Sequence, residues 1–212
     1  MRTAEQIADS LADTILQRLV GTQRQLIALA GPPAAGKSTI AEAVLHAVQG
    51  RGVAAGSLAM DGFHLDNTVL SDREMLARKG APETFDLAGF RAMVERLQGG
   101  QEVIAPTFDR ALDKSVAGSV VIPTAAQVIV VEGNYLLLDE PGWRDLAGFW
   151  DQAVFLDVPI DELERRLIER WLSYGLTQEE ARARAMSNDI PNARRVVEHC
   201  VPADRLRALH IV

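Results

Sequence analysis

The sequence predicts an α/β domain built on a parallel sheet, and three observations lead to this fold class. A glycine-rich segment, Gly31–Ser38, follows the apolar run Leu26–Ala30 and precedes a helical pattern. A second apolar run, Val128–Val131, shows no polar alternation, as is typical of a strand buried on both faces of a parallel sheet. The chain has 212 residues, of which 48% are hydrophobic, so it is long enough for one such domain and short for two. We therefore expect residues 1–212 to form a single domain.

The composition limits the functional classes. The net charge is −7 and the pI is about 5.1, and because general nucleic-acid binders are usually basic, we expect no nucleic-acid partner. No apolar stretch approaches the roughly 18 residues of a membrane span, and Met1–Gln6 has an acidic residue and no apolar core, so we expect neither membrane association nor a signal peptide. Cys200 is the only cysteine, which excludes an intrachain disulfide and fits a cytoplasmic location.

The first expected element is an amphipathic helix over Thr3–Val20, with Ile7, Leu11 and Ile15 on one face. It precedes the strand Leu26–Ala30 and is expected to pack on one side of the sheet. A structural role is therefore expected for it.

The glycine-rich segment matches the phosphate-binding spacing Gly-x4-Gly-Lys-[Ser/Thr] in full and has the flanking strand and helix that this loop requires. Its glycines allow the backbone to approach an anion closely, and the amides at the helix N-terminus attract phosphate oxygens. Lys37 is expected to reach the β- and γ-phosphates and Ser38 to bind magnesium. A plain turn between strand and helix is the alternative. The predicted nucleotide-binding residues of this segment are Gly31, Pro32, Pro33, Ala34, Ala35, Gly36, Lys37, Ser38 and Thr39.

A second strand is expected over Val53–Met60, and it ends at Asp61. Chemistry in parallel α/β sheets collects at the carboxyl ends of strands, so Asp61 should lie on the same edge as the phosphate loop. A carboxylate there can take the proton of a substrate hydroxyl as that hydroxyl attacks the γ-phosphate. The alternative is that Asp61 caps a turn with Gly62.

The middle of the chain is expected to be polar and irregular. Ser71–Gly80 resembles a short polar helix that Gly80 closes, and Asp86 is a suitable N-cap for a helix over Leu87–Leu97. Arg78 and Lys79 either contact an anionic substrate or are solvated, and the sequence leaves both alternatives open. A short strand at 102–106 and the β-branched run Val116–Ile122 favour a small hairpin or flap.

The run over Gln127–Tyr135 is the clearest buried strand, and Glu132 lies where it emerges. This is the place of the second acidic residue of phosphate-loop enzymes, which holds magnesium directly or through water. A capping role for Glu132 in the following loop is the alternative. Ala153–Pro159 is expected to form another core strand, and Leu206–Val212 a final one.

Two consecutive helices with arginines on both arms are predicted between these last strands. The first spans Asp161–Tyr174 and carries Arg166 and Arg170, and the second begins at Thr177, where Glu180 completes a capping box. This arrangement is typical of a mobile lid, spanning about 161–190, whose guanidinium groups close over phosphates. Interleaved glutamates also allow these arginines to form ordinary surface ion pairs.

Together these motifs resemble the superfamily of phosphate-loop kinases that includes uridine kinase, phosphoribulokinase and bacterial-type pantothenate kinase. The resemblance runs from about Leu26 to Asn192. It rests on Gly31–Ser38, Asp61-Gly62-Phe63, the segment Lys79–Asp86, Pro106-x-Phe108-Asp109 and Val131-Glu132-Gly133.

The resemblance implies a P-loop NTPase fold, with a three-layer α/β/α arrangement, a five-stranded parallel sheet of order 2-3-1-4-5 and a helical lid. It implies that the enzyme uses ATP and Mg²⁺, with Asp61 as base, Lys37 and Ser38 on phosphate and magnesium, Glu132 supporting the metal, and Arg166 and Arg170 reaching the phosphates. Asn192, near the end of the lid, is assigned to the nucleotide site on the same grounds. Related kinases often form dimers or tetramers, so a homodimer is one alternative that the sequence leaves open.

The sequence identifies the phosphoryl acceptor less closely than it identifies the nucleotide. Uridine kinases usually carry a serine and an aromatic pair after the aspartate, whereas here Gly62-Phe63-His64 follows. The sequence is more similar to a bacterial group of fructose-transport-associated or pantothenate-kinase-like kinases, which favours a small hydroxylated, sugar-like acceptor. The residues expected to contact it are Phe63, His64, Arg78, Lys79, Phe85, Arg110, Asn134 and Tyr135.

Alternative functions remain at this stage. A nucleoside such as uridine, or pantothenate, is an alternative acceptor for the kinase. A nucleotide-binding regulatory module and an ATP hydrolase without an acceptor belong to a different class. Guanine-specific switches and transporter ATPases are not favoured, because their Asn-Lys-x-Asp and Ser-Gly-Gly signatures are missing.

Overall fold

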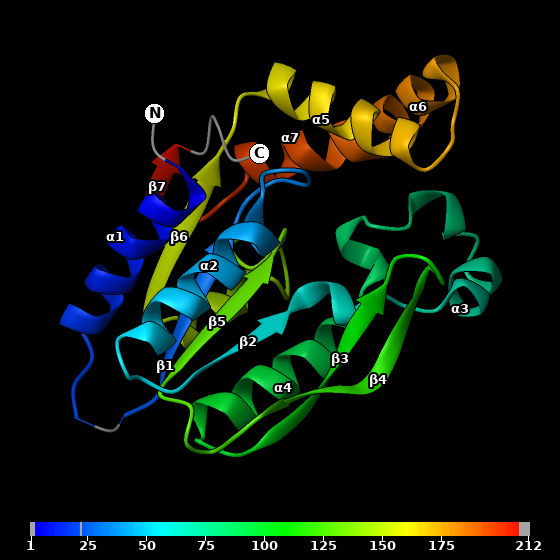
Figure 1. Cartoon of the computed structure of the whole chain (residues 1–212). Coiled ribbons are helices and arrows are strands. Elements are labelled where there is room, and N and C mark those ends of the chain that lie inside the picture. Colours follow the sequence, from blue (N-terminus) through cyan, green and yellow to red (C-terminus); the bar gives the residue numbers. More distant parts are fainter. Residues whose placement is uncertain (1–2, 22, 208–212) are drawn as a thin grey trace.

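A five-stranded parallel sheet forms the centre of the molecule (Figure 1). The structure is a computed structural model that describes residues 3–21 and 23–207. Its sheet has the order β2-β5-β1-β6-β7, and all neighbouring strands are parallel. The strands are β1 (Gln25–Ala30), β2 (Ala55–Ala59), β5 (Val128–Gly133), β6 (Gln152–Asp157) and β7 (Asp204–Arg207). Counted without the separate two-stranded sheet, this order is 2-3-1-4-5, so the expected α/β fold class is confirmed.

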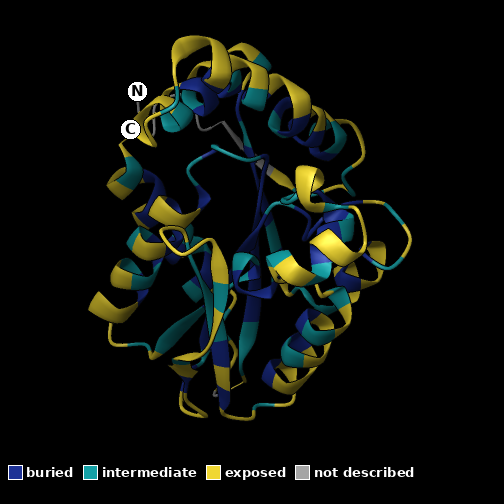
Figure 2. Cartoon of the chain, turned by 90° about the vertical axis from the view of Figure 1, so that its right-hand side faces the viewer, coloured by how far each residue is buried: buried dark blue, intermediate teal, exposed yellow. Residues whose placement is uncertain are grey.

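Two apolar clusters cover the two faces of the sheet. Alternate residues of β1 point to opposite faces, because side chains alternate along a strand: Ile27 joins one cluster and Leu26 the other. The first cluster includes apolar residues of α1 (Ala4–Gln17), α2 (Lys37–Gly50) and α5 (Ile160–Ser173). The second includes those of α4 (Leu87–Gln98). Figure 2 shows the consequence, with buried residues along the strands and exposed residues on the outer sides of the helices.

A hairpin lies beside the main sheet. Its strands, β3 (Val103–Asp109) and β4 (Lys114–Ile122), pair antiparallel, and their register shifts between Ala105 and Thr107. The predicted hairpin is therefore confirmed, with a longer first strand than expected. The hairpin approaches the turn after β2 closely, because a Cβ on Gly62 would lie 2.4 Å from the Pro106 carbonyl oxygen.

The expected polar helix over Ser71–Gly80 is wrong in extent. The helix there is α3 (Asn67–Asp72), which Asp66 caps by accepting a hydrogen bond from the Thr68 amide. Glu74 then adopts a left-handed φ of 56°, which ends the helix. Three short 3₁₀ segments complete this region, at Met60–Phe63, Leu76–Arg78 and Pro82–Thr84.

The predicted lid segment forms α5, α6 (Gln178–Arg184) and the start of α7 (Ile190–Glu198). The capping box at Thr177 is present. The sequence Asn188-Asp189-Ile190-Pro191-Asn192 predicts a break in the helix, and this prediction is wrong, because a π-helical turn, Ala185–Asp189, joins α6 to α7 without interruption. In Figure 1 these helices lie beyond the ends to which the arrows of β5 and β6 point.

The last expected strand, Leu206–Val212, is only partly testable. β7 begins earlier, at Asp204, and residues 208–212 lie outside the described part of the chain. Across the described residues, none of the helices has the length and apolar character that a bilayer span requires.

Candidate active site

The phosphate loop has the tight backbone that its glycines predict. A Cβ on Gly31 would lie 2.9 Å from the Leu156 carbonyl oxygen, so the loop leaves β1 in close contact with β6. Gly36 has φ 88° and precedes the first residue of α2, where a side chain would be strained. Ala34 also has a positive φ, of 63°, which is uncommon outside glycine and typical of strained functional loops.

A lysine and a hydroxyl at the start of α2 face the end of β5. Lys37 is buried, and its Nζ donates hydrogen bonds to the Pro32 carbonyl oxygen at 3.0 Å and to Asn134 Oδ1 at 2.6 Å. Ser38 Oγ donates to Glu132 Oε1 at 3.0 Å. These contacts arise because β1 and β5 are adjacent, with Leu29 opposite Glu132.

The charges of this group influence one another. Burial raises the pKa of the Glu132 carboxyl, and the nearby Asp61 raises it further. Burial lowers the pKa of the Lys37 ammonium, while Glu132 and Asp61 act in the opposite direction. The site is therefore a set of opposite charges held together in a poorly solvated place.

Asp61 lies at the carboxyl end of β2, beside the same group. Ala59 pairs with Glu132 in the sheet, and Asp61 follows two residues later in a 3₁₀ turn. Its carboxylate is 26% exposed and accepts a hydrogen bond from Arg110 Nη2 at 3.0 Å. Arg110 comes from the turn of the β3–β4 hairpin, so the hairpin contributes a cation to the predicted base.

A cleft of about 1170 Å³ joins these elements. Single-ligand pockets usually measure about 300–1,000 Å³, so this cleft has room for a nucleotide and a second small molecule. The predicted site residues that line it are Pro33, Ala34, Gly36, Lys37, Ser38, Thr39, Asp61, His64, Lys79, Arg110, Glu132, Asn134, Arg170 and Asn192.

One wall, which we call the hairpin side, is formed by Asp61, His64, Asn67, Lys79, Phe108, Arg110 and Asp113. The His64 ring lies between Phe85 and Phe108, with ring centroids 4.1 and 4.5 Å away. Its Nδ1 is 2.8 Å from the Asp61 carbonyl oxygen, which requires Nδ1 to carry the hydrogen when the ring is neutral. Burial lowers the pKa of His64, more than Asp61 raises it.

Three residues that were expected to contact the substrate do not line the cleft but lie in the core beneath the hairpin side. Phe63, Phe85 and Tyr135 are buried in the second core cluster. Tyr135 Oη donates to the Gly80 carbonyl oxygen at 2.6 Å, and Phe63 packs edge-on against Phe90. These residues support the segment that carries His64 and Lys79.

Other predicted residues also lie away from the lining. Arg78 is exposed and pairs with Glu83, which favours the solvated alternative for it. The loop residues Gly31, Pro32 and Ala35 shape the turn from beneath the lining. Arg165 and Arg182, two further arginines of the lid segment, form ion pairs with glutamates on its surface.

Arg166 is placed differently from these surface arginines. Its Nε donates to Glu162 at 2.7 Å and its Nη1 to the Ala34 carbonyl oxygen at 3.3 Å, so it joins α5 to the phosphate loop. Within residues 3–21 and 23–207, its Nη2 is a buried side-chain nitrogen without a hydrogen-bond partner. Such an atom is costly unless a ligand satisfies it.

The sequence prediction missed several residues of the cleft. Trp171 Nε1 donates to Asp189 Oδ2 at 2.6 Å, and the Arg184 guanidinium lies 5.3 Å from the Trp171 ring. The helical spacing of the apolar residues in 161–174 predicts an inward face for Trp171, and no spacing signal distinguishes a core face from a face that lines a cleft. The lining residues that were missed are Asn67, Leu76, Gly80, Phe108, Ala111, Asp113, Trp171, Tyr174, Arg184 and Asp189.

The residues present fit a nucleotide phosphate chain with magnesium. Lys37, Arg170 and the unpartnered Nη2 of Arg166 supply cationic donors around the loop. Ser38 and Glu132 supply two adjacent oxygen ligands, which suits Mg²⁺ because that ion usually keeps waters and substrate phosphates as its other ligands. Among the residues that the structure describes, no cluster of three or more His, Cys, Asp or Glu side chains suitable for a metal occurs.

Comparison with known proteins gives a consistent result. The family model described as "Phosphoribulokinase / Uridine kinase family" matches residues 26–201. The chain is 35% identical to YggC of Escherichia coli over 86% of its own length and 76% of the relative. It is 34% identical to a Schizosaccharomyces pombe protein described as "Putative uridine kinase C227.14", over 92% of this chain and 88% of that one.

A solved structure is also similar. The crystal structure of a Silicibacter sp. TM1040 protein, described as a "putative fructose transport system kinase", is 46% identical, with a TM-score of 0.89 over 93% of this chain and 97% of the other. Sequence and fold similarity therefore extend together over nearly the whole chain.

Proposed function

This chain belongs to the phosphoribulokinase/uridine kinase family and is a phosphate-loop kinase with a hydroxyl acceptor, and we propose that its acceptor is a small sugar-like molecule. The observation that supports phosphoryl transfer to a hydroxyl group is the position of Asp61. Its carboxylate faces the cleft from the end of β2, beside the Lys37, Ser38 and Glu132 group at the start of α2 and the end of β5. A base next to a phosphate site is the arrangement that phosphoryl transfer to an alcohol needs.

On this proposal the phosphate loop binds the ATP phosphates. Lys37 exchanges its hydrogen bonds with the Pro32 carbonyl and Asn134 for contacts to phosphate oxygens, and the helix N-terminus of α2 adds its amides. A magnesium ion held by Ser38 and Glu132 would neutralise phosphate charge. Two asparagines also line the cleft: Asn192 is a further candidate contact of the nucleotide, and Asn134 is a candidate contact of the acceptor.

Asp61 would accept the proton of the attacking hydroxyl. In the unliganded arrangement its carboxylate is bound to Arg110, so the acceptor hydroxyl must take a position on the other carboxylate oxygen or displace the guanidinium. His64 would hold a second hydroxyl, because its bonded Nδ1–H leaves Nε2 as a hydrogen-bond acceptor. Several acceptor atoms along one wall suit a polyhydroxylated substrate.

We propose that residues 161–190 act as the lid. Arg170 lines the cleft and Arg166 reaches the phosphate loop, so both can neutralise charge that spreads onto the transferred group. Closure would exclude water, which otherwise competes as the acceptor. We also propose that residues 1–212 form one kinase domain in the cytoplasm.

Two observations support a sugar-like acceptor: the similarity to a solved structure and the polar groups on the hairpin side of the cleft. The 46% identical Silicibacter protein carries the description "putative fructose transport system kinase". The cleft's hairpin side presents carboxylate, imidazole and amide groups from Asp61, His64 and Asn67, which are hydrogen-bonding partners for hydroxyl groups.

ADP release with and without acceptors tests the proposal. The panel contains D-fructose, other hexoses and pentoses, uridine, pantothenate and a sample without acceptor, each with ATP and Mg²⁺. We expect a sugar to stimulate ADP release strongly above the sample without acceptor. Stimulation by uridine or pantothenate alone would contradict the sugar proposal, and hydrolysis that no acceptor stimulates would contradict kinase function.

A further inference from the structure

Lys79 is placed to hold the hairpin, not to bind substrate. Its side chain is only 8% exposed. Nζ donates to Asn67 Oδ1 at 2.7 Å and to the Asp113 carbonyl oxygen at 2.6 Å, and it lies 3.0 Å from Asp113 Oδ2. An ammonium has three hydrogens to donate, so these three oxygens use its full capacity.

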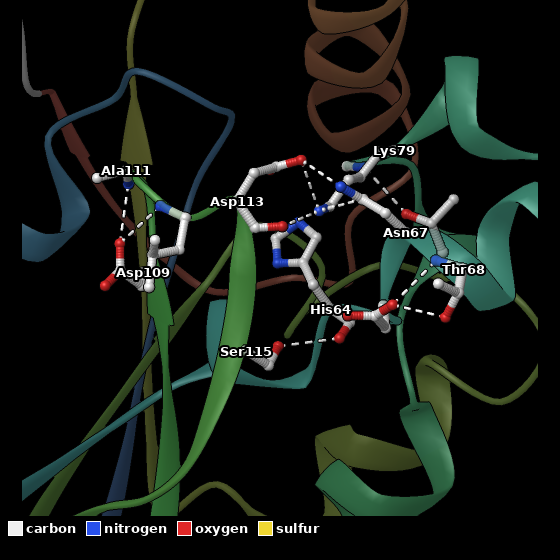
Figure 3. A network of polar contacts seen from close by, with 12 residues as sticks. His64, Asn67, Thr68, Lys79, Asp109, Ala111, Asp113 and Ser115 are labelled. Atoms are coloured by element: carbon white, nitrogen blue, oxygen red, sulfur yellow. Dashed lines mark hydrogen bonds and ion pairs between the residues drawn. The ribbon is translucent and has the colours of Figure 1, made fainter.

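Asn67 closes the same group into a triangle, as Figure 3 shows. Its Nδ2 donates to Asp113 Oδ2 at 2.9 Å while its Oδ1 accepts from Lys79. Asp66 fixes the start of α3 through Thr68, and Asn67 is the first residue of that helix. The three residues Asn67, Lys79 and Asp113 are called the clasp below.

The clasp holds an unfavourable backbone conformation at the tip of the hairpin. Asp113 has φ 50°, a left-handed value that non-glycine residues adopt at a cost. Such a conformation persists when surrounding contacts determine it, and here both the carbonyl and the carboxylate of Asp113 are bound.

A second attachment of the hairpin lies in the middle of β3. Gly62 and Pro106 are in close contact there, and the register of β3 with β4 shifts between Ala105 and Thr107. A register shift bends a strand locally. The part of the hairpin beyond Pro106 therefore depends for its position on the contacts of the tip, which are the clasp and the contacts of Phe108, Arg110 and Ser115 with the segment after β2.

The tip carries the groups that complete the hairpin side of the cleft. Arg110 binds Asp61, Phe108 packs on the His64 ring, and Ser115 Oγ donates to the His64 carbonyl oxygen at 2.9 Å. A displaced tip would take Arg110 and Phe108 away from Asp61 and His64.

We propose that Lys79 is a positioning residue, which clasps the tip of the β3–β4 hairpin to α3 through Asp113 and Asn67 and so forms the acceptor wall of the cleft. The predicted effect of Lys79 on acceptor binding rests on the proposed function, whereas its predicted effect on the position of the hairpin does not. Lys37 and the phosphate loop lie on other elements, so the clasp acts on acceptor binding and leaves nucleotide binding unaffected.

Hydrogen exchange of the ligand-free protein tests the clasp directly. Lys79→Met removes the three donors and keeps the apolar stem, and Lys114→Met removes an exposed lysine of the same hairpin as the control. We expect the amides of residues 110–115 to exchange at least about tenfold faster in Lys79→Met and within about twofold of the parent in Lys114→Met. Unchanged exchange at 110–115, or equal acceleration across the main sheet, would overturn the proposal.

If Lys79→Met does not fold, a variant that removes fewer of the clasp's contacts still tests the clasp by hydrogen exchange. Asn67→Ala removes the two sides of the triangle that Asn67 forms and leaves the third, the Lys79–Asp113 ion pair. We expect a smaller acceleration confined to residues 110–115, and acceleration elsewhere would overturn the proposal.

Steady-state kinetics with D-fructose as the acceptor probe distinguishes an effect of Lys79 on the acceptor wall from a general loss of protein stability. We expect Lys79→Met to raise the KM for D-fructose about tenfold or more while the KM for ATP stays within about twofold. Equal increases in both would contradict the proposal. If the parent protein does not phosphorylate D-fructose, the exchange result alone decides the clasp, and the sugar proposal fails only if the other hexoses and pentoses of the panel also receive no phosphoryl group.

Discussion

At the scale of single residues, the site depends on charges that are buried together. Lys37, Glu132 and Asp61 influence one another because β1, β5 and β2 are neighbours in the sheet. Removing one of them leaves the others without compensation in a poorly solvated place, which is costly. Substitutions of the buried Lys37 and Glu132 should therefore alter nucleotide binding more strongly than substitutions of exposed charges of the same type.

Lys37→Ala should weaken ATP binding. The ammonium is the buried cation of the phosphate loop, and a hydrogen bond to a charged group contributes roughly 1.5–3 kcal/mol, so the Kd should rise about 10- to 100-fold. Calorimetric titration with ATP measures it, with exposed Lys114→Ala as the matched control. An unchanged Kd in Lys37→Ala would refute its role.

His64 should make stability depend on pH. Burial lowers its pKa in the folded state, so the unfolded chain binds the proton at a higher pH and stability falls as pH decreases below about 6.5. At pH 5 the loss can reach about 2 kcal/mol, the limit set by the unfolded-state pKa.

Urea unfolding of the parent and of His64→Asn between pH 5 and 7.5 measures this effect. The difference between the two proteins should shrink as the pH falls, because only the parent has this imidazole to protonate. His46→Asn is the control. A constant difference over this range would contradict the burial of a neutral His64.

At the scale of elements, the lid segment and the hairpin enclose the cleft from two directions. Arg166 of α5 reaches the Ala34 carbonyl, and Asn188 of the π-helical turn donates to the Lys79 carbonyl oxygen at 2.9 Å. The lid segment therefore contacts the phosphate loop through Arg166 and the backbone of the clasp residue Lys79 through Asn188. π-helical turns often occur at functional sites.

Arg170→Met should lower kcat with little change in protein stability. Its side chain lines the cleft, and loss of one donor that stabilises transition-state charge costs about 100-fold. Steady-state rates with the acceptor that the panel identifies measure it. Arg165→Met is the control, because Arg165 pairs with Glu162 and Glu169 on the surface, and equal losses in both variants would contradict the lid role of Arg170.

The sequence predicted those elements whose pattern is local. The phosphate loop, the strand-end acids Asp61 and Glu132 and the capping box at Thr177 depend on short-range spacing, and the structure has them where they were expected. The clasp was not predictable, because Asn67, Lys79 and Asp113 are far apart in the chain and meet only through the folded hairpin. For the same reason, Phe63, Phe85 and Tyr135 looked like ligand contacts although they are core residues.

At the scale of the whole molecule, one cleft joins two sets of residues from opposite parts of the fold. The phosphate loop and Arg170 surround one end, and the hairpin side surrounds the other. Asp61 lies between them at the edge of the sheet. The central claim is that a phosphoryl group passes across this cleft to a hydroxyl whose proton Asp61 accepts.

Transfer of label from [γ-³²P]ATP tests this claim most directly, in the parent protein and in Asp61→Asn. We expect the parent to place the label on a sugar. We expect Asp61→Asn to bind ATP with unchanged affinity but to transfer label about 100- to 10,000-fold more slowly, the usual contribution of a general base. Label that appears only as inorganic phosphate with every acceptor, or an Asp61→Asn variant that transfers at the parent rate, would contradict it.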